Sequence, residues 1–282
     1  MSAINLLDLI SLAGCADRPN EDRAGLAGRH AWVIDGATGL GEPLMGGASD
    51  AAWLAQRCHE AFTRHADVED PAELLSRSAD DLVASFEAER RRSLDASWEL
   101  PCGAFMLASW RDGGLDLSWS ADCRAIVETD GGILLSFGAS ALSEEAEAAL
   151  VARLGQGGDP ARRYREPAAL EALREQRGVA LAPARSIILC PDRGFLEHLG
   201  RARISARRLR LLLMTDGFAA AELRYGLHDG PRALMAAAAA GGLQPIAAAL
   251  RRFEAEVDPD CVLRPRWKRS DDATALRLEI SA

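Results

Sequence analysis

The chain has little of what marks several large classes of protein. Its 33 Lys and Arg stand against 42 Asp and Glu, which gives a net charge of −9. It therefore lacks the basic excess that binding to nucleic-acid phosphates requires. No apolar run approaches the roughly 18 residues that a membrane-spanning helix needs. We expect neither nucleic acid nor a membrane among its partners.

Cysteine is sparse and scattered. The six cysteines form no CxxC pair, and no histidines stand at zinc-ligand spacing. This pattern is typical of reduced, mostly buried thiols in a cytoplasmic protein. The first eleven residues carry no Lys or Arg and include Asp8, which does not fit a secretory leader. We therefore expect a cytoplasmic location.

Length and composition are those of an ordinary globular protein. The chain has 282 residues, of which 48% are apolar and 27% are charged. That length is compatible with one large domain, and we find no internal repeat and no low-complexity linker. We expect residues 1–282 to form a single domain.

Two helices are expected in the first third of the chain. Apolar residues recur at helical spacing over residues 51–62 and again over residues 75–86. The second helix should begin with a cap at Asp70, a proline at Pro71 and a capping-box acid at Glu73. Both helices would then present one apolar face to a sheet.

Strand signals lie before and after these helices. Short apolar runs separated by Asp112-Gly113 and Asp130-Gly131 predict an antiparallel meander over residues 104–137. Residues 142–178 have a polar, helical pattern with a glycine-rich break at 155–158, so the region 138–205 could form a lid or flap. Further strands are expected at residues 30–34, 186–190, 209–215 and 272–280, and further helices at 231–240 and 243–256.

This order of elements predicts the fold class. Strands come first, followed by two helices, more strands, more helices and a last strand. Regularly alternating strands and helices would indicate a parallel sheet, and this chain does not have them. The pattern predicts an α+β fold of two antiparallel sheets covered by helices.

Acidic residues recur where apolar strands begin or end. They are Glu21-Asp22, Asp35-Gly36, Asp216-Gly217 and Asp271-Asp272. A glycine beside a carboxylate lets the backbone approach closely, so that a carbonyl can join a set of oxygen ligands. Hard divalent cations such as Mg²⁺ and Mn²⁺ prefer carboxylate, carbonyl and water oxygens. Each Asp-Gly taken alone could equally be a turn, but the recurrence favours a metal site.

Five segments in a fixed order carry a family resemblance. They read RPNEDR at 18–23, VIDGATG at 33–39, ADCRA at 121–125, LLMTDG at 212–217 and DDAT at 271–274. Together they resemble the ordered motifs of the metal-dependent protein phosphatases, the PPM or type 2C serine/threonine phosphatases, here of a bacterial type. The resemblance implies a four-layer αββα sandwich of two antiparallel sheets flanked by helices.

The resemblance also implies ligands for two Mn²⁺ or Mg²⁺ ions and a role for each. Asp35 would bridge both ions, and Gly36 would donate its carbonyl. Asp122 could help to hold a third, weaker ion, or it could instead orient Arg124. The remaining ligands would be Glu21 or Asp22, together with Asp216 and Asp271.

Two positions depart from the family pattern. The family usually has a histidine directly after the Asp-Gly, as an acid for the leaving group, and here that residue is Ala37. Many members place a phosphate-binding arginine four residues before the glutamate. That position is Asp17 here, with Arg18 one step away, so Arg18 is the expected phosphate-binding residue.

The implied activity is hydrolysis of phosphoserine and phosphothreonine in proteins. In such sites a hydroxide shared by the two ions attacks phosphorus directly, so no cysteine would act as a nucleophile. The basic stretch 201–210 could favour acidic phosphopeptides, or it could be a solvated surface. One alternative is a small-molecule phosphate ester as substrate. Another is an inactive binding module, which would be expected to lack a core ligand such as Asp35, Asp216 or Asp271.

Overall fold

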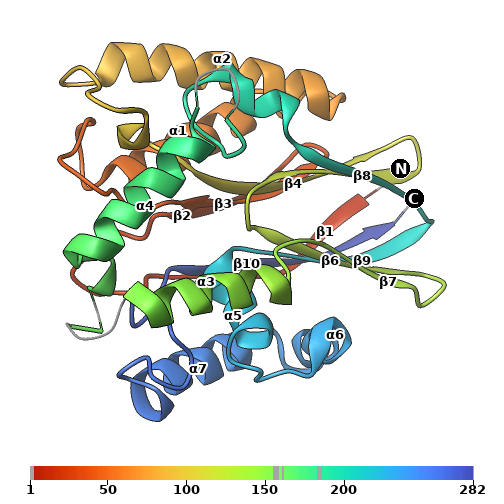
Figure 1. Ribbon diagram of the computed structural model, residues 1–282. Helices are drawn as coiled ribbons and strands as arrows, with labels where there is room; N and C mark the ends of the chain where they lie inside the picture. The colour runs from red at the N-terminus through yellow and green to blue at the C-terminus, as the bar shows by residue number, and fades with distance from the viewer. Residues whose placement is uncertain (1–2, 155–158, 161, 183–185, 282) are drawn as a thin grey trace.

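The protein is a sandwich of two antiparallel sheets, seen in the computed structural model in Figure 1, which describes residues 3–154, 159–160, 162–182 and 186–281. One sheet has the strand order β2-β3-β4-β5-β8 and the other β1-β10-β9-β6-β7. The strands are β1 (Ala3–Leu12), β2 (Asp22–Ala27), β3 (His30–Gly36), β4 (Gly103–Arg111), β5 (Gly114–Ser120), β6 (Arg124–Thr129), β7 (Leu134–Gly138), β8 (Gly200–Ser205), β9 (Arg208–Met214) and β10 (Ala273–Ser281).

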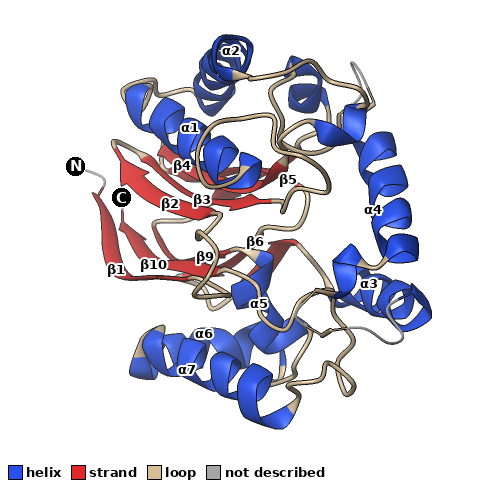
Figure 2. Ribbon diagram, turned by 90° about the vertical axis from the view of Figure 1, so that its left-hand side faces the viewer, coloured by secondary structure: helices blue, strands red, loops and turns tan. Residues whose placement is uncertain are grey.

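Helices cover the outer face of each sheet. Figure 2 shows α1 and α2 above the β2–β5 sheet, and α5, α6 and α7 below the other. The expected α+β class and four-layer αββα arrangement are therefore confirmed. The helices are α1 (Asp50–Arg64), α2 (Pro71–Glu89), α3 (Ala141–Leu154), α4 (Pro167–Ala180), α5 (Asp216–Leu223), α6 (Gly230–Gly241) and α7 (Gln244–Arg252), which a π-helix continues over Phe253–Val257.

Strand β3 is apolar on both faces because both are buried. Ala31 and Val33 join the core between the two sheets, whereas Trp32 and Ile34 join the core under α1 and α2. Successive side chains of a strand point to opposite faces, so a central layer of such a sandwich reads as a continuous apolar run. The strand carries the chain to Asp35 at one end of the sandwich.

The stretch 104–137 is not one meander, as its turn signals predicted. β4 and β5 form a hairpin in one sheet, and β6 and β7 form a hairpin in the other. The chain crosses between the sheets at residues 121–123, where Ala121 adopts a positive φ of 55°. Apolar alternation predicts strands but does not distinguish a turn within a sheet from a corner between sheets. The crossing leaves Asp122 at the end of the sandwich.

The predicted start of α2 is confirmed in position, with Asp70 as the N-cap residue, whereas the predicted strand at 186–190 is wrong. α2 begins at Pro71 as expected, but the side chain of Asp70 makes no capping hydrogen bond and lies 3.5 Å from Arg111 instead. Residues 186–190 form no strand, because Leu189 makes only a single bridge, to Gly103. An acid before a proline and a short apolar run are each compatible with more than one local structure.

The basic stretch 201–210 spans two strands that belong to different sheets. It forms most of β8 and β9, and its arginines pair with acids on neighbouring strands, as in Arg203 with Asp116 and Arg210 with Glu128. β9 runs toward Asp216, so the connection from β8 to β9, which crosses between the sheets, lies at the other end of the strand. Much of the charge of the stretch is thus balanced within the sheets.

Helices α3 and α4 stand apart from the other helices. Figure 2 shows both at one end of the sandwich, beside the ends of both sheets. They account for the helical pattern of residues 142–178, and the predicted break at 155–158 lies outside the described residues. A short 3₁₀ turn over Arg163–Arg165 precedes α4.

No single helix in the described part of the chain is long and apolar enough to cross a bilayer. Only α6 together with α7 and its π-helical continuation meets those criteria, as a pair bent by 119°.

Candidate metal centre

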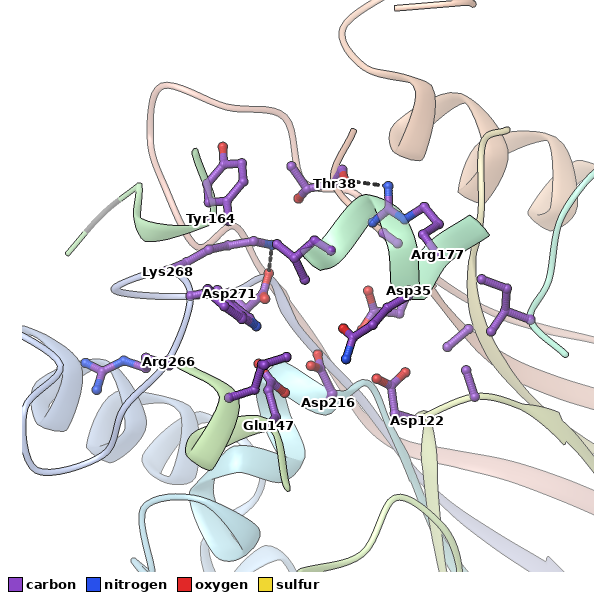
Figure 3. Close-up of a pocket in the computed structure, with 18 of the residues that line it drawn as sticks. Asp35, Thr38, Asp122, Glu147, Tyr164, Arg177, Asp216, Arg266, Lys268 and Asp271 are labelled. Atoms are coloured by element: carbon purple, nitrogen blue, oxygen red, sulfur yellow. Dashed lines mark hydrogen bonds and ion pairs between the residues drawn. The ribbon is translucent and has the colours of Figure 1, made fainter. Parts of the chain in front are cut away.

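A cavity of about 900 Å³ opens between the sheet ends and helices α3 and α4. Asp35 lies at the end of β3, Asp216 follows β9, and Asp271 precedes β10. Because β9 and β10 are antiparallel neighbours, the end of one and the start of the other meet at the same edge. Asp122 comes from the crossing between the sheets, and Figure 3 shows these four carboxylates facing one space.

The carboxylates in this cavity repel one another. Burial, and then the charges of Asp216 and Asp22, raise the pKa of Asp35 well above its usual range. Asp122 keeps an accessible surface toward the cavity, yet desolvation by the surrounding protein and the charge of Asp216 raise its pKa to about 7. Within the described residues, no other residue donates to or pairs with the carboxylates of Asp35, Asp122 and Asp216. Negative charge gathered without partners is unfavourable unless a cation neutralises it.

Glycines beside two of the acids allow close backbone packing. A Cβ on Gly36 would lie 2.7 Å from the carbonyl oxygen of Ala51 and 2.8 Å from that of Glu21. A Cβ on Gly217 would overlap the carbonyl oxygen of Asp272. Any side chain at either position would push apart the strand ends that carry the carboxylates.

The Glu21-Asp22 pair lies behind the cavity and does not line it. The carboxylate of Glu21 accepts hydrogen bonds from Thr38 Oγ1 at 2.7 Å and Ser49 Oγ at 2.6 Å. Asp22 is buried and accepts from Thr215 Oγ1 at 2.8 Å. Its other oxygen, Oδ1, has no donor among the described residues. A metal role for either residue stays a prediction.

A lysine already neutralises one of the expected ligands. Lys268 Nζ lies 2.7 Å from Asp271 Oδ1 (Figure 3). Burial alone would raise the pKa of Asp271, but the Lys268 ammonium and its hydrogen bond outweigh burial and lower it. A divalent ion would therefore have to compete with Lys268 for this carboxylate.

The donor set fits hard divalent cations by its chemistry. Carboxylates from separate strand ends, and glycines that allow backbone carbonyls to approach them, are the groups that Mn²⁺ and Mg²⁺ prefer. In their present positions, no three His, Cys, Asp or Glu side chains of the described residues converge on one point. The carboxylates face one cavity without forming a closed ligand shell.

Helix α3 contributes to the cavity an acid that no sequence motif marks. Burial, and then Asp216, raise the pKa of Glu147 to about 7, although Arg224 opposes the shift. Arg224 donates to Glu144 at 2.6 Å and to Glu147 at 3.1 Å, which ties α3 to the end of α5. Only a tertiary contact distinguishes Glu147 from the other acids of a polar helix.

Two expectations about basic residues can be compared with the structure. Arg18 does not line the cavity; its Nη1 donates to the hydroxyl of Tyr164 at 2.9 Å. The alternative role of Asp122, orienting Arg124, is wrong, because Arg124 pairs with Glu222 at 3.1 Å. Asp122 is left facing the acids of the cavity.

The loop that carries Lys268 and Asp271 is organised by Asp258. Its carboxylate accepts from three backbone amides at residues 262–264 and from Arg266 Nη1 at 2.6 Å. Arg266 is only 1% exposed, so its charge depends on this one carboxylate. The pair holds the backbone that leads to the cavity.

We expect Asp258→Ala to destabilise the fold strongly. Removing one partner of a buried pair leaves the other charge uncompensated, which typically costs about 3–5 kcal/mol in unfolding free energy. Burial would raise the pKa of Asp258, but the hydrogen bonds outweigh it and lower it. The stabilisation is therefore present above the unfolded pKa and is lost only as the pH falls through the lower folded value. Urea unfolding at neutral pH should show the loss, with Asp260→Ala as a neighbouring control. Equal midpoints for the two variants would contradict it.

By sequence, the chain matches no family model and no curated protein. Its structure is similar to several solved phosphatases. A catalytic domain of the serine/threonine protein phosphatase PstP, in complex with two manganese ions, aligns with a TM-score of 0.55 and 16% identity over 100% of both chains. The serine/threonine phosphatase of S. agalactiae gives a TM-score of 0.54 and 12% identity over 99% of both chains. The PPM phosphatase MsPP from Mycobacterium smegmatis, in complex with cacodylate, gives 0.51 and 15% over 99% of this chain and 97% of that one.

The chain therefore has the fold of the PPM serine/threonine phosphatases. The alignment covers nearly the whole of each chain. Identities of 12–16% show the fold alone.

Proposed function

We propose that this chain is a cytoplasmic, metal-dependent phosphatase that hydrolyses phosphoserine and phosphothreonine in proteins. One observation carries the proposal: Asp35, Asp122, Asp216 and Asp271, which are far apart in sequence, face a single cavity. The solved phosphatases of this fold support the substrate class, and the two manganese ions of one of them support the metal. In this proposal α3 and α4 form a cap over the site.

Asp35, Asp216 and Asp271 would hold two cations, with the carbonyl of Gly36, and Asp122 could join a weaker third site. Bound there, Mn²⁺ or Mg²⁺ would supply an activated water and neutralise charge on the phosphoryl oxygens. The chain itself would exclude bulk solvent with α3 and α4. It would also keep the backbone at Gly36 and Gly217 close to the carboxylates.

The cysteines are poorly suited to nucleophilic catalysis. All six are free, and all but Cys15 are buried. Cys102 is the thiol that lines the cavity, and burial raises its pKa. Since the thiolate is the nucleophilic form, such a thiol is unreactive at neutral pH.

Metal dependence should appear both in stability and in turnover. Adding Mn²⁺ or Mg²⁺ should raise the melting temperature, because an ion at a hundred times its dissociation constant adds about 2.7 kcal/mol to the free energy of unfolding. Hydrolysis of p-nitrophenyl phosphate and of phosphopeptides should require the ion and stop with EDTA. It should continue after treatment with iodoacetamide. Turnover that ignores EDTA but is lost on alkylation would refute the proposal.

A second candidate function follows from Lys268. A cation that already pairs with Asp271 could weaken metal loading, and the protein would then bind phosphopeptides without hydrolysing them. The two functions differ in the product. Phosphopeptide binding with no phosphate released at millimolar Mn²⁺ would favour the binding module.

A further inference from the structure

The cavity lacks a phosphate-binding arginine at the expected place. Asp17 stands four residues before Glu21, and Arg18 points to Tyr164, with its guanidinium 5.8 Å from the centre of that ring. Neither Asp17 nor Arg18 lines the cavity. A phosphoryl group entering the site would therefore need a cation from another part of the chain.

Most of the cavity's own cations are already paired with carboxylates. Arg224 binds Glu144 and Glu147, and Lys268 binds Asp271. Arg266 is buried against Asp258. Of the described cations that line the cavity, the two without a carboxylate partner are Arg153 and Arg177.

Arg177 differs from Arg153 in how it is held. It lies in the last turn of α4 and is partly buried, and its Nη1 donates to the backbone carbonyl of Thr38 at 3.0 Å. Figure 3 shows its guanidinium directed toward Thr38 at the wall of the cavity. The bond to Thr38 is the one side-chain hydrogen bond of Arg177 among the described residues, so most of its five side-chain N–H donors and all of its charge stay available. Arg153 is an exposed residue near the end of α3.

We propose that Arg177 binds the phosphoryl group of the substrate, in place of the arginine that position 17 lacks. The inference rests on the proposed function and adds a specific residue to it. A guanidinium matches a phosphate with two parallel hydrogen bonds, and the carbonyl of Thr38 fixes its direction. Ala37 adds only a methyl group to this wall of the cavity, which Arg177 and Asp35 also line.

The same helix offers a matched control. Arg174 also ties α4 to this loop, because its Nε and Nη2 donate to the carbonyl of Leu40 at 3.0 and 2.6 Å. Its guanidinium lies 4.3 Å from the ring centre of Trp98, and it does not line the cavity. Arg174→Gln therefore loosens the cap without removing a cation from the site.

The test measures inorganic phosphate on the Mn²⁺-loaded full chain. Calorimetric titration gives its dissociation constant, and product inhibition of p-nitrophenyl phosphate hydrolysis gives its inhibition constant. A hydrogen bond to a charged group is typically worth a factor of about 10 to 100 in affinity. Arg177→Gln should raise both the dissociation constant and the inhibition constant of phosphate by that factor, and it should raise KM. Arg177→Lys should recover part of the loss, and Arg174→Gln should bind phosphate as the wild type does.

Three outcomes would overturn the role of Arg177. They are unchanged phosphate affinity in Arg177→Gln, an equal loss in Arg174→Gln, and a loss in Arg153→Gln alone. Wild-type turnover of p-nitrophenyl phosphate tests the phosphatase itself. If turnover is present and Arg177→Gln is unchanged, only this inference fails. If turnover is absent while phosphate binding depends on Arg177, only the proposed hydrolysis fails.

Discussion

Replacing Asp35 by asparagine is expected to abolish hydrolysis and most of the rise in melting temperature that Mn²⁺ causes. The side chain keeps its size but loses the charge that a hard cation requires. Asp35 is also the carboxylate whose pKa burial and its acidic neighbours raise well above the usual range. Removing its charge therefore acts on both the loaded and the metal-free protein, with opposite signs.

The metal-free variant should be more stable than the metal-free wild type. A carboxyl with a raised folded pKa loses stability as the pH rises above its unfolded pKa of about 3.9. Asp35→Asn removes this penalty, so its advantage in EDTA should be larger at pH 8 than at pH 5. Asp67→Asn, on an exposed loop residue after α1, is the control. A variant that keeps turnover, or that melts lower than wild type in EDTA at pH 8, would contradict this account.

The ends of β3 and β9 are predictable from the sequence because both faces of these strands are buried over the residues that lead to the cavity. The four residues before Asp35 are apolar and buried, and β9 likewise ends in four apolar, buried residues shortly before Asp216. Period and composition are local properties, so such strands can be found without a structure. The choice of sheet is not local. The corner at Asp122 has the same appearance in sequence as a hairpin turn, and for this reason one expected meander is in fact two hairpins.

The cavity wall formed by α3 and α4 could not be predicted in the same way. Glu147 and Arg177 lie on polar helices, where charged residues are common and carry no positional signal. Their importance comes from contacts with distant parts of the chain. Arg177, for example, donates to Thr38, which lies 139 positions away in the sequence. Arg18 shows the converse, because a motif neighbour can turn away from the site toward Tyr164.

Ala37 is the position where a general acid is expected to matter most. Family members usually carry a histidine there. The alternative donor Thr38 already gives its hydroxyl hydrogen to Glu21 at 2.7 Å. An alkyl phosphate such as phosphoserine needs a proton on its leaving oxygen, whereas p-nitrophenolate leaves readily without one. General acid help typically accelerates such steps by about 10²- to 10⁴-fold.

We therefore expect Ala37→His to accelerate phosphopeptide hydrolysis by about 10²-fold or more and to leave p-nitrophenyl phosphate nearly unchanged. Ala37 packs against the cluster of Cys102, Leu181 and Cys190, but it also lines the cavity, so the ring has space on that side. The gain should fade as the pH rises through the imidazole pKa, since only the protonated ring can donate. Ala37→Phe adds a ring without a proton and should show no gain. Equal changes on both substrates, at every pH, would mean that the ring acts by size and that leaving-group protonation does not limit this site.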